Sequence, residues 1–159
     1  MEVGSLVGIK YLLEIMMETE FDFGDGLVPA HRHKNPSGTE GGWVADSASV
    51  SDKVTVTRYA EVFDNAVIFG NVMITKHAKI FGNAWVYGNA WVFGNAKVGG
   101  KACVFENAKV CGKAEVIESA RVYGNASVGG CIVVDGNIEV SGEGGLYVKE
   151  EISGDYHEI

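Results

Sequence analysis

One residue in every six is a β-branched aliphatic over most of this chain. Counting in sixes from Val44 to Val140, all seventeen positions are Val or Ile. A second row lies two residues before the first and runs from Ala48 to Ile138, with Ala at twelve of its sixteen positions and Val or Ile at the rest. An α-helix repeats every 3.6 residues or so, and a period of six therefore cannot keep a row on one helical face. The period instead predicts short strands separated by regularly spaced corners.

The residues between the two rows are typical of corners. Gly-Asn pairs recur at residues 82–83, 88–89, 94–95 and 124–125. Gly and Asn accept the left-handed backbone angles that other residues avoid. We expect each β-branched residue to point inward from its strand, and the Ala near the corner to fit where little space remains. Three strands and three corners make a triangular coil of eighteen residues, and stacked coils form a parallel β-helix of about five to six coils.

The repeat consists of an aliphatic residue, turn residues, a small residue and a variable one, and it resembles that of the hexapeptide-repeat proteins. The resemblance covers residues 42–141 and implies an all-β, left-handed parallel β-helix. Within that superfamily, the segment HRHKNPSGTEGGWVADSASVSDKVTV and the YGNA-type repeats are most similar to uncharacterised bacterial and phage proteins whose repeats begin with a GGWV-like motif. Those proteins carry no activity that can be transferred to this chain.

We expect one domain in three parts. Residues 1–41 are predicted to form a helix, from about Ser5 to Glu18, and a loop that together cap the first coil. Residues 42–141 form the β-helix, and residues 142–159 are predicted to be an acidic tail or a second cap. Caps are expected because an uncovered coil edge invites association with other strands.

Charge and cysteine content narrow the class of protein. The net charge of −8 belongs to the two ends, because residues 31–141 hold eleven basic and ten acidic residues. A near-neutral body argues against a nucleic-acid-binding face. The three cysteines form no CxxC pair and no secretory signal or membrane-spanning stretch is recognised, so we expect a cytoplasmic protein.

The outward positions beside each aliphatic residue are the candidate binding surface. Residues eighteen apart stack, which places aromatic and apolar side chains in columns on one face, with a shorter apolar run on the next face. The predicted interface residues are Val67, Phe69, Trp85, Tyr87, Cys103, Phe105, Arg121 and Tyr123 on the first face, and Trp91 and Phe93 on the second. Contiguous apolar patches usually mark partner surfaces. Hexapeptide-repeat proteins are commonly trimers, so the resemblance favours a homotrimer; a different protein partner and a platform for sugar rings are the alternatives.

Two other regular features have structural explanations. Asn71, Asn89, Asn107 and Asn125 lie eighteen residues apart and are predicted to form a hydrogen-bonded ladder at one corner. The third face mixes Glu61, Lys79, Lys97 and Glu115, which predicts ion pairs between neighbouring coils.

An enzyme is the alternative class. Many hexapeptide-repeat proteins are acyltransferases that use a His as general base and loops that leave the β-helix. Here the six-residue phase is unbroken, and the weak catalytic candidates are His77, at a corner, and His31. A γ-type carbonic anhydrase would need three metal-binding His residues, whereas the repeats contain one.

His31 and His33 are weak metal-ligand candidates, because residues two apart on an extended segment project to the same side. Two ligands do not complete a site, so we predict neither a metal nor a cofactor. The sequence favours a non-catalytic, self-associating interaction protein. An acyl-CoA-dependent acyltransferase with a site between subunits is the first alternative, and a phage-type inhibitor that blocks a host protein is the second.

Overall fold

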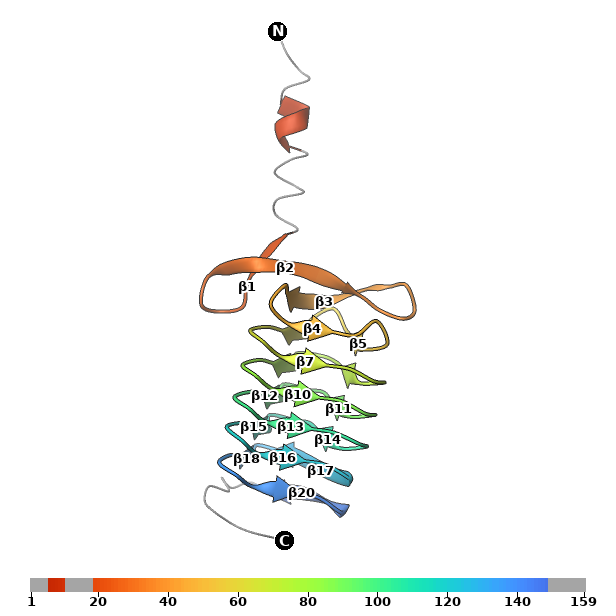
Figure 1. Ribbon diagram of the computed structural model, residues 1–159, viewed down its shortest axis with the longest axis vertical. Helices are drawn as coiled ribbons and strands as arrows, with labels where there is room; N and C mark the ends of the chain where they lie inside the picture. Colours follow the sequence, from red (N-terminus) through yellow and green to blue (C-terminus); the bar gives the residue numbers. More distant parts are fainter. Residues whose placement is uncertain (1–5, 11–18, 149–159) are drawn as a thin grey trace.

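The predicted left-handed parallel β-helix is confirmed by a computed structural model, which describes residues 6–10 and 19–148 (Figure 1). Residues 6–10 are helical; residues 1–5 and 11–18, which hold the rest of the predicted helix, lie outside the described residues. The coils stack in chain order into a prism with three sheets along its sides.

Each side of the prism is one sheet. The first sheet has the order β1 (Glu20–Asp22), β2 (Leu27–Lys34), β3 (Glu40–Ala45), β6 (Glu61–Val62), β9 (Lys79–Ile80), β12 (Lys97–Val98), β15 (Glu115–Val116) and β18 (Val133–Val134). The second runs β4 (Ser49–Val50), β7 (Val67–Ile68), β10 (Trp85–Val86), β13 (Cys103–Val104), β16 (Arg121–Val122) and β19 (Glu139–Val140). The third runs β5 (Thr55–Val56), β8 (Met73–Ile74), β11 (Trp91–Val92), β14 (Lys109–Val110), β17 (Asn125–Gly130) and β20 (Glu143–Val148).

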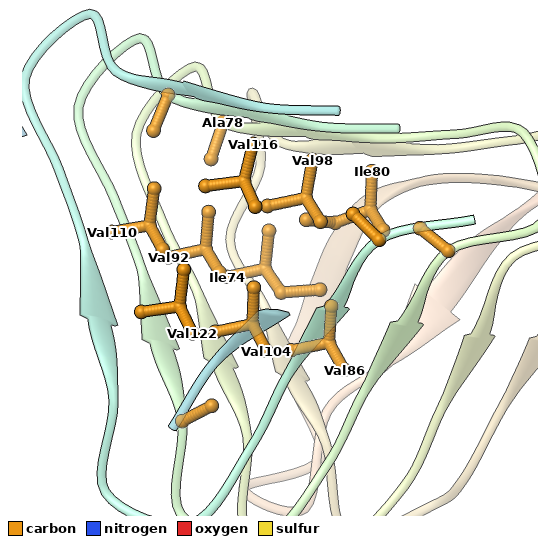
Figure 2. Packing of buried hydrophobic residues seen from close by; sticks show 14 of the residues in the cluster. Ile74, Ala78, Ile80, Val86, Val92, Val98, Val104, Val110, Val116 and Val122 are labelled. Carbon is orange, nitrogen blue, oxygen red and sulfur yellow. The ribbon is translucent and has the colours of Figure 1, made fainter. Parts of the chain in front are cut away.

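The two inward rows form the core, as the period predicts. Every aliphatic residue of the first row from Val56 to Val134 is at most 1% exposed, and the Ala residues of the second row lie beside them (Figure 2). Burying one Val or Ile side chain contributes about 1.5–3 kcal/mol. Val50 and Val140 are only partly buried because they lie in the first and last coils.

The corners repeat one backbone conformation. Every sixth residue from Asp64 to Gly142 has a positive φ, and ten of these fourteen residues are Gly. In the Gly-Asn pairs the Gly, and not the Asn, has the positive φ. Asp64 and Glu106 tolerate the same angle, and their carboxylates accept the backbone N–H of Gly82 at 2.9 Å and of Gly124 at 2.8 Å, one coil further on.

The prediction of a helix and a loop for residues 1–41 is partly wrong, because residues 20–22 and 27–34 form two strands joined by a turn. The antiparallel strands β1 and β2 extend the first sheet beyond β3, and β2 lies across the first coil (Figure 1). The free edge of β3 explains this arrangement, since its unpaired backbone groups accept another strand.

Polar side chains cover the first edge of the third sheet, where no earlier coil exists. The His33 Nε2–H donates to the carbonyl of Val54 at 2.8 Å, and the Asn35 Oδ1 accepts the N–H of Val56 at 2.9 Å. Both side chains are buried, at 5% and 7% exposure. They therefore satisfy two backbone groups that the missing coil would otherwise satisfy.

The β-helix also extends past its predicted end. β20 pairs with β17 in parallel over six residues, from Asn125 with Glu143 to Gly130 with Val148. Of the two expectations for residues 142–159, a tail or a second cap, the tail is wrong for residues 143–148, which form a strand on the last coil; residues 149–159 lie outside the described residues.

Candidate functional site

The aromatic residues of the second sheet's face stack into a continuous ladder, as their spacing of eighteen predicts. Ring centroids are 5.0 Å apart from Phe69 to Tyr87, 4.9 Å from Tyr87 to Phe105 and 5.0 Å from Phe105 to Tyr123. The interplanar angles are 4°, 6° and 5°, so the rings are nearly parallel. Because the ring faces contact each other, the ladder presents mainly ring edges, which disfavours its use as a platform for sugar rings.

The ladder is less exposed than the sequence suggests. Phe105 is buried at 8% exposure, and Tyr87 and Tyr123 are half-buried, whereas Phe69 at the end of the ladder is 41% exposed. The expectation that Phe105 belongs to an exposed patch is wrong, since neighbouring rings cover it on both faces. Burial raises the pKa of the Tyr87 phenol; Cys103 and Glu106 add to this effect, and the Arg121 guanidinium opposes it.

The second column of this face is apolar over its first three residues and ends in a charged residue, Arg121. Val67, Trp85, Cys103 and Arg121 pair in register on successive coils. Trp85 is 47% exposed and meets Phe69 edge to face at 6.2 Å, whereas Val67 and Cys103 are half-buried. The strongly exposed apolar surface on this side is therefore concentrated at Trp85 and Phe69.

Arg121 marks the polar end of the same column. Its Nη1 donates to Glu139 Oε1 at 2.8 Å, and the Tyr123 hydroxyl donates to Glu139 Oε2 at 3.1 Å. The hydrogen bond to Glu139 is the main cause of the raised pKa of Arg121. Sequence reasoning missed Glu139, although its distance of eighteen residues from Arg121 was the available signal.

Further exposed apolar side chains lie across the corner, on the third sheet. Trp91 is 37% exposed and Met73, its partner in the neighbouring coil, is 41% exposed. Trp91 also contacts Phe93 at 4.9 Å. We call Phe69, Trp85, Met73 and Trp91 the corner patch, because the two pairs flank the corners at residues 70–71 and 88–89. The patch thus covers two sides of the prism instead of one flat face.

The Asn ladder lies at the corner between these sides. Nδ2–H donates to Oδ1 of the Asn one coil further on, at 3.4 Å from Asn71 to Asn89, 3.2 Å from Asn89 to Asn107 and 3.1 Å from Asn107 to Asn125. The predicted ladder is confirmed, and it holds the coils together beside the patch.

His77 lies at another corner, beside the first sheet. Its ring stacks on Tyr59 at 5.3 Å, and together with Lys79, Asn95 and Lys97 it lines an open hollow of about 320 Å³. Lys79 forms an ion pair with Glu61 at 2.7 Å and Lys97 with Glu115 at 2.8 Å, which confirms the predicted pairs between coils. The hollow therefore has basic groups, but two of them already have acidic partners.

His31 and His33 do not share a site, so the metal-ligand hypothesis for this pair is wrong. The His31 Nδ1 lies 2.7 Å from Asp46 Oδ1 in an exposed pair, whereas His33 is buried against the carbonyl of Val54. The pairing of β2 with β3 is irregular between Arg32 and Lys34, which breaks the alternation that would place both rings on one side. Within residues 6–10 and 19–143, no group of three metal-ligating side chains is found.

None of Cys103, Cys111 and Cys131 forms a disulfide within the described residues; Cys111 is buried and Cys131 is exposed. Over the part of the chain that the structure describes, no helix has the length and apolar content needed to cross a membrane.

Comparison with known proteins supports the fold. The chain matches no protein-family model, and no curated protein matches it in sequence. A solved structure similar to this chain is that of a mutant perosamine N-acetyltransferase from Caulobacter crescentus, in complex with CoA and GDP-perosamine. The TM-score is 0.55 at 19% sequence identity, and the match covers 62% of this chain and 49% of that chain. At this identity the similarity shows the fold alone.

Proposed function

We propose that this protein is a self-associating β-helical scaffold whose copies meet through the corner patch. The observation that supports this proposal most directly is the exposure of two Trp side chains on adjacent sides of one corner, Trp85 at 47% and Trp91 at 37%. Trp is enriched among the residues that dominate binding energy at protein interfaces. A rigid stack of coils holds both rings in place, which lowers the entropic cost of binding.

The balance of charge over the three sides of the prism supports contact with another copy. The pairs Lys79–Glu61, Lys97–Glu115 and Arg121–Glu139 neutralise charges between coils. A neutral body does not repel a second copy, and the apolar patch supplies the area to bury. The resemblance to hexapeptide-repeat proteins favours three copies. Binding of a different protein, including a host protein blocked by a phage inhibitor, is the alternative use of the same patch.

Replacing both exposed Trp residues tests this function. The double variant Trp85→Ser and Trp91→Ser should keep the fold, because both side chains point outward, and should weaken self-association by roughly 30-fold, or about 2 kcal/mol. Sedimentation velocity over a range of concentrations measures the change. Tyr59→Ser is the matched control, since Tyr59 is 63% exposed but lies at a different corner. Unchanged association of the double variant would reject the corner patch as the interface.

A second candidate function, acyl transfer, rests on the hollow at His77. The hollow combines an imidazole with the ammonium groups of Lys79 and Lys97, on a fold shared with an N-acetyltransferase whose structure holds CoA. His77 would act as general base: it would take the proton of an acceptor amine or hydroxyl as that group attacks the thioester carbonyl, and the CoA thiolate would leave. The lysines would contact the phosphates of the acyl donor.

Thermal unfolding with acetyl-CoA tests this candidate. If the hollow binds the donor, acetyl-CoA at a hundred times its Kd should add about 2.7 kcal/mol of stability and raise Tm by roughly 5–10 °C. His77→Gln should abolish acetyl transfer while leaving most of the thermal shift, because the lysines remain. The scaffold function predicts no shift with acetyl-CoA, and a clear shift would favour the enzyme.

A further inference from the structure

A small recess lies between the β1–β2 turn and the first coils, on a different part of the molecule from the corner patch and from His77. Its volume is about 90 Å³. At roughly 30 Å³ for each water molecule, it has room for about three waters or the end of one small ligand. β2 lies across the end of the stacked coils (Figure 1), and the β1–β2 turn contributes Phe23, Asp25 and Gly26 to the lining of the recess.

The walls of the recess are apolar. Phe23, Val28 and Phe63 line it, and the rings of Phe23 and Phe63 stack at 4.9 Å with an interplanar angle of 20°. Phe63 stacks in turn on Phe81 at 5.4 Å. The position of Phe23 is thus fixed by a column of rings on the first sheet, which makes the recess largely pre-formed.

The polar groups of the recess are two carboxylates and a hydroxyl. Asp25, Asp64 and Ser47 supply them. Among the ion pairs of the described residues, none includes Asp25 or Asp64. Within the part of the chain that the structure describes, the Asp64 carboxylate accepts one hydrogen bond, from the N–H of Gly82 at 2.9 Å, which leaves further acceptor positions on its oxygens.

The turn that carries Asp25 is itself held in place. Asp22 Oδ1 accepts the N–H groups of Gly24 at 2.8 Å and of Gly26 at 3.0 Å, and these bonds lower the pKa of Asp22. The Asp22 carboxylate therefore forms hydrogen bonds within the turn, whereas the Asp25 carboxylate lines the recess. Two carboxylates that form no ion pair among the described residues therefore line an otherwise apolar pocket.

From this arrangement we infer that the recess binds a short-chain alkylammonium group. The ammonium would donate to the carboxylates of Asp25 and Asp64, and the alkyl chain would contact Phe23, Val28 and Phe63. The stacked ring faces are already occupied, so the rings supply apolar contact and not a cation–π interaction. The volume limits the bound part to a single short chain with its charged end.

The test uses n-butylammonium chloride as the probe and the full chain labelled with ¹⁵N. Titration should shift the amide resonances of Gly24, Gly26 and Ser47 in a saturable manner, with sodium chloride added to the reference at equal ionic strength. The uncharged probe 1-butanol is the matched ligand, and it should bind at least about tenfold more weakly because it lacks the charge-assisted hydrogen bonds. Equal affinity for the two probes, or shifts located elsewhere, would overturn the inference.

Two variants check which groups bind the charge. Asp25→Asn should weaken butylammonium binding by about tenfold and leave 1-butanol binding unchanged. Asp64→Asn should do the same, and its amide oxygen still accepts the N–H of Gly82 while Asn tolerates the positive φ of this position. If Asp64→Asn fails to fold, Asp25→Asn tests the inference by itself, because Asp25 lies in an exposed turn where the substitution should not disturb folding. Unchanged butylammonium affinity in a folded variant would overturn the inference.

Discussion

Replacing Gly88 with Ala is expected to lower the free energy of unfolding by about 2–5 kcal/mol. Gly88 has φ +76°, and a Cβ at this position would lie 2.8 Å from the backbone N of Glu106 in the next coil. The left-handed angle costs a non-Gly residue about 1–2 kcal/mol, and forcing the coils apart adds about 1–3 kcal/mol. Urea unfolding at fixed protein concentration measures the loss.

Gly136 provides the matched control for this prediction. It has φ +64° at an equivalent corner, but a Cβ there would have no atom within 4 Å. Gly136→Ala should therefore lower the free energy of unfolding by only about 1–2 kcal/mol, which is the cost of the left-handed angle for a non-Gly residue. Equal losses in the two variants would show that backbone conformation alone explains the glycines, and that the close approach of the coils has no energetic effect.

Removing the two buried polar side chains at the first coil is expected to cost about 2–6 kcal/mol. In the double variant His33→Ala and Asn35→Ala, the carbonyl of Val54 and the N–H of Val56 lose their partners. Each unpaired buried group costs about 1–3 kcal/mol. The loss should appear as a lower midpoint of urea unfolding, and increased hydrogen exchange at Val56 would place it at the first coil.

The pair His31 and Asp46 serves as the control for the double variant. These side chains are 55% and 56% exposed and belong to the same cap. Removing both should cost less than about 1 kcal/mol, because exposed ion pairs contribute little. A larger loss than in the double variant would contradict the assignment of His33 and Asn35 as the groups that satisfy the first edge.

The repeats could be predicted from the sequence because one short period determines both the inside and the corners. From Val56 to Val134, the inward residue of each strand follows from counting in sixes. The same spacing predicts the Asn ladder and the ion pairs between coils. The first end could not be predicted in this way, because β1 and β2 form antiparallel pairs beyond β3 and lie outside the six-residue period. β20 pairs with β17 at the same spacing of eighteen residues, so the period does predict its register, although the row of Val and Ile ends at Val140.

The candidate site was predicted in part. The spacing of eighteen residues places Phe69, Tyr87, Phe105 and Tyr123 in one column, but it does not show how far neighbouring rings cover each other. Burial of Phe105 and the exposure of Trp85 and Trp91 both depend on side-chain packing, which sequence spacing does not give. The recess at the β1–β2 turn had no signal in the sequence, because its residues come from the turn and the first coils.

Sedimentation equilibrium of the unmodified chain tests the central claim, self-association through the corner patch, most directly. We expect a mass of two or more chains of 17.0 kDa, with three copies favoured, and no change on addition of a reductant, since no disulfide involves Cys103, Cys111 or Cys131 within the described residues. A mass of 17.0 kDa at every concentration would contradict self-association. It would leave Trp85 and Trp91 as the surface for a different protein partner.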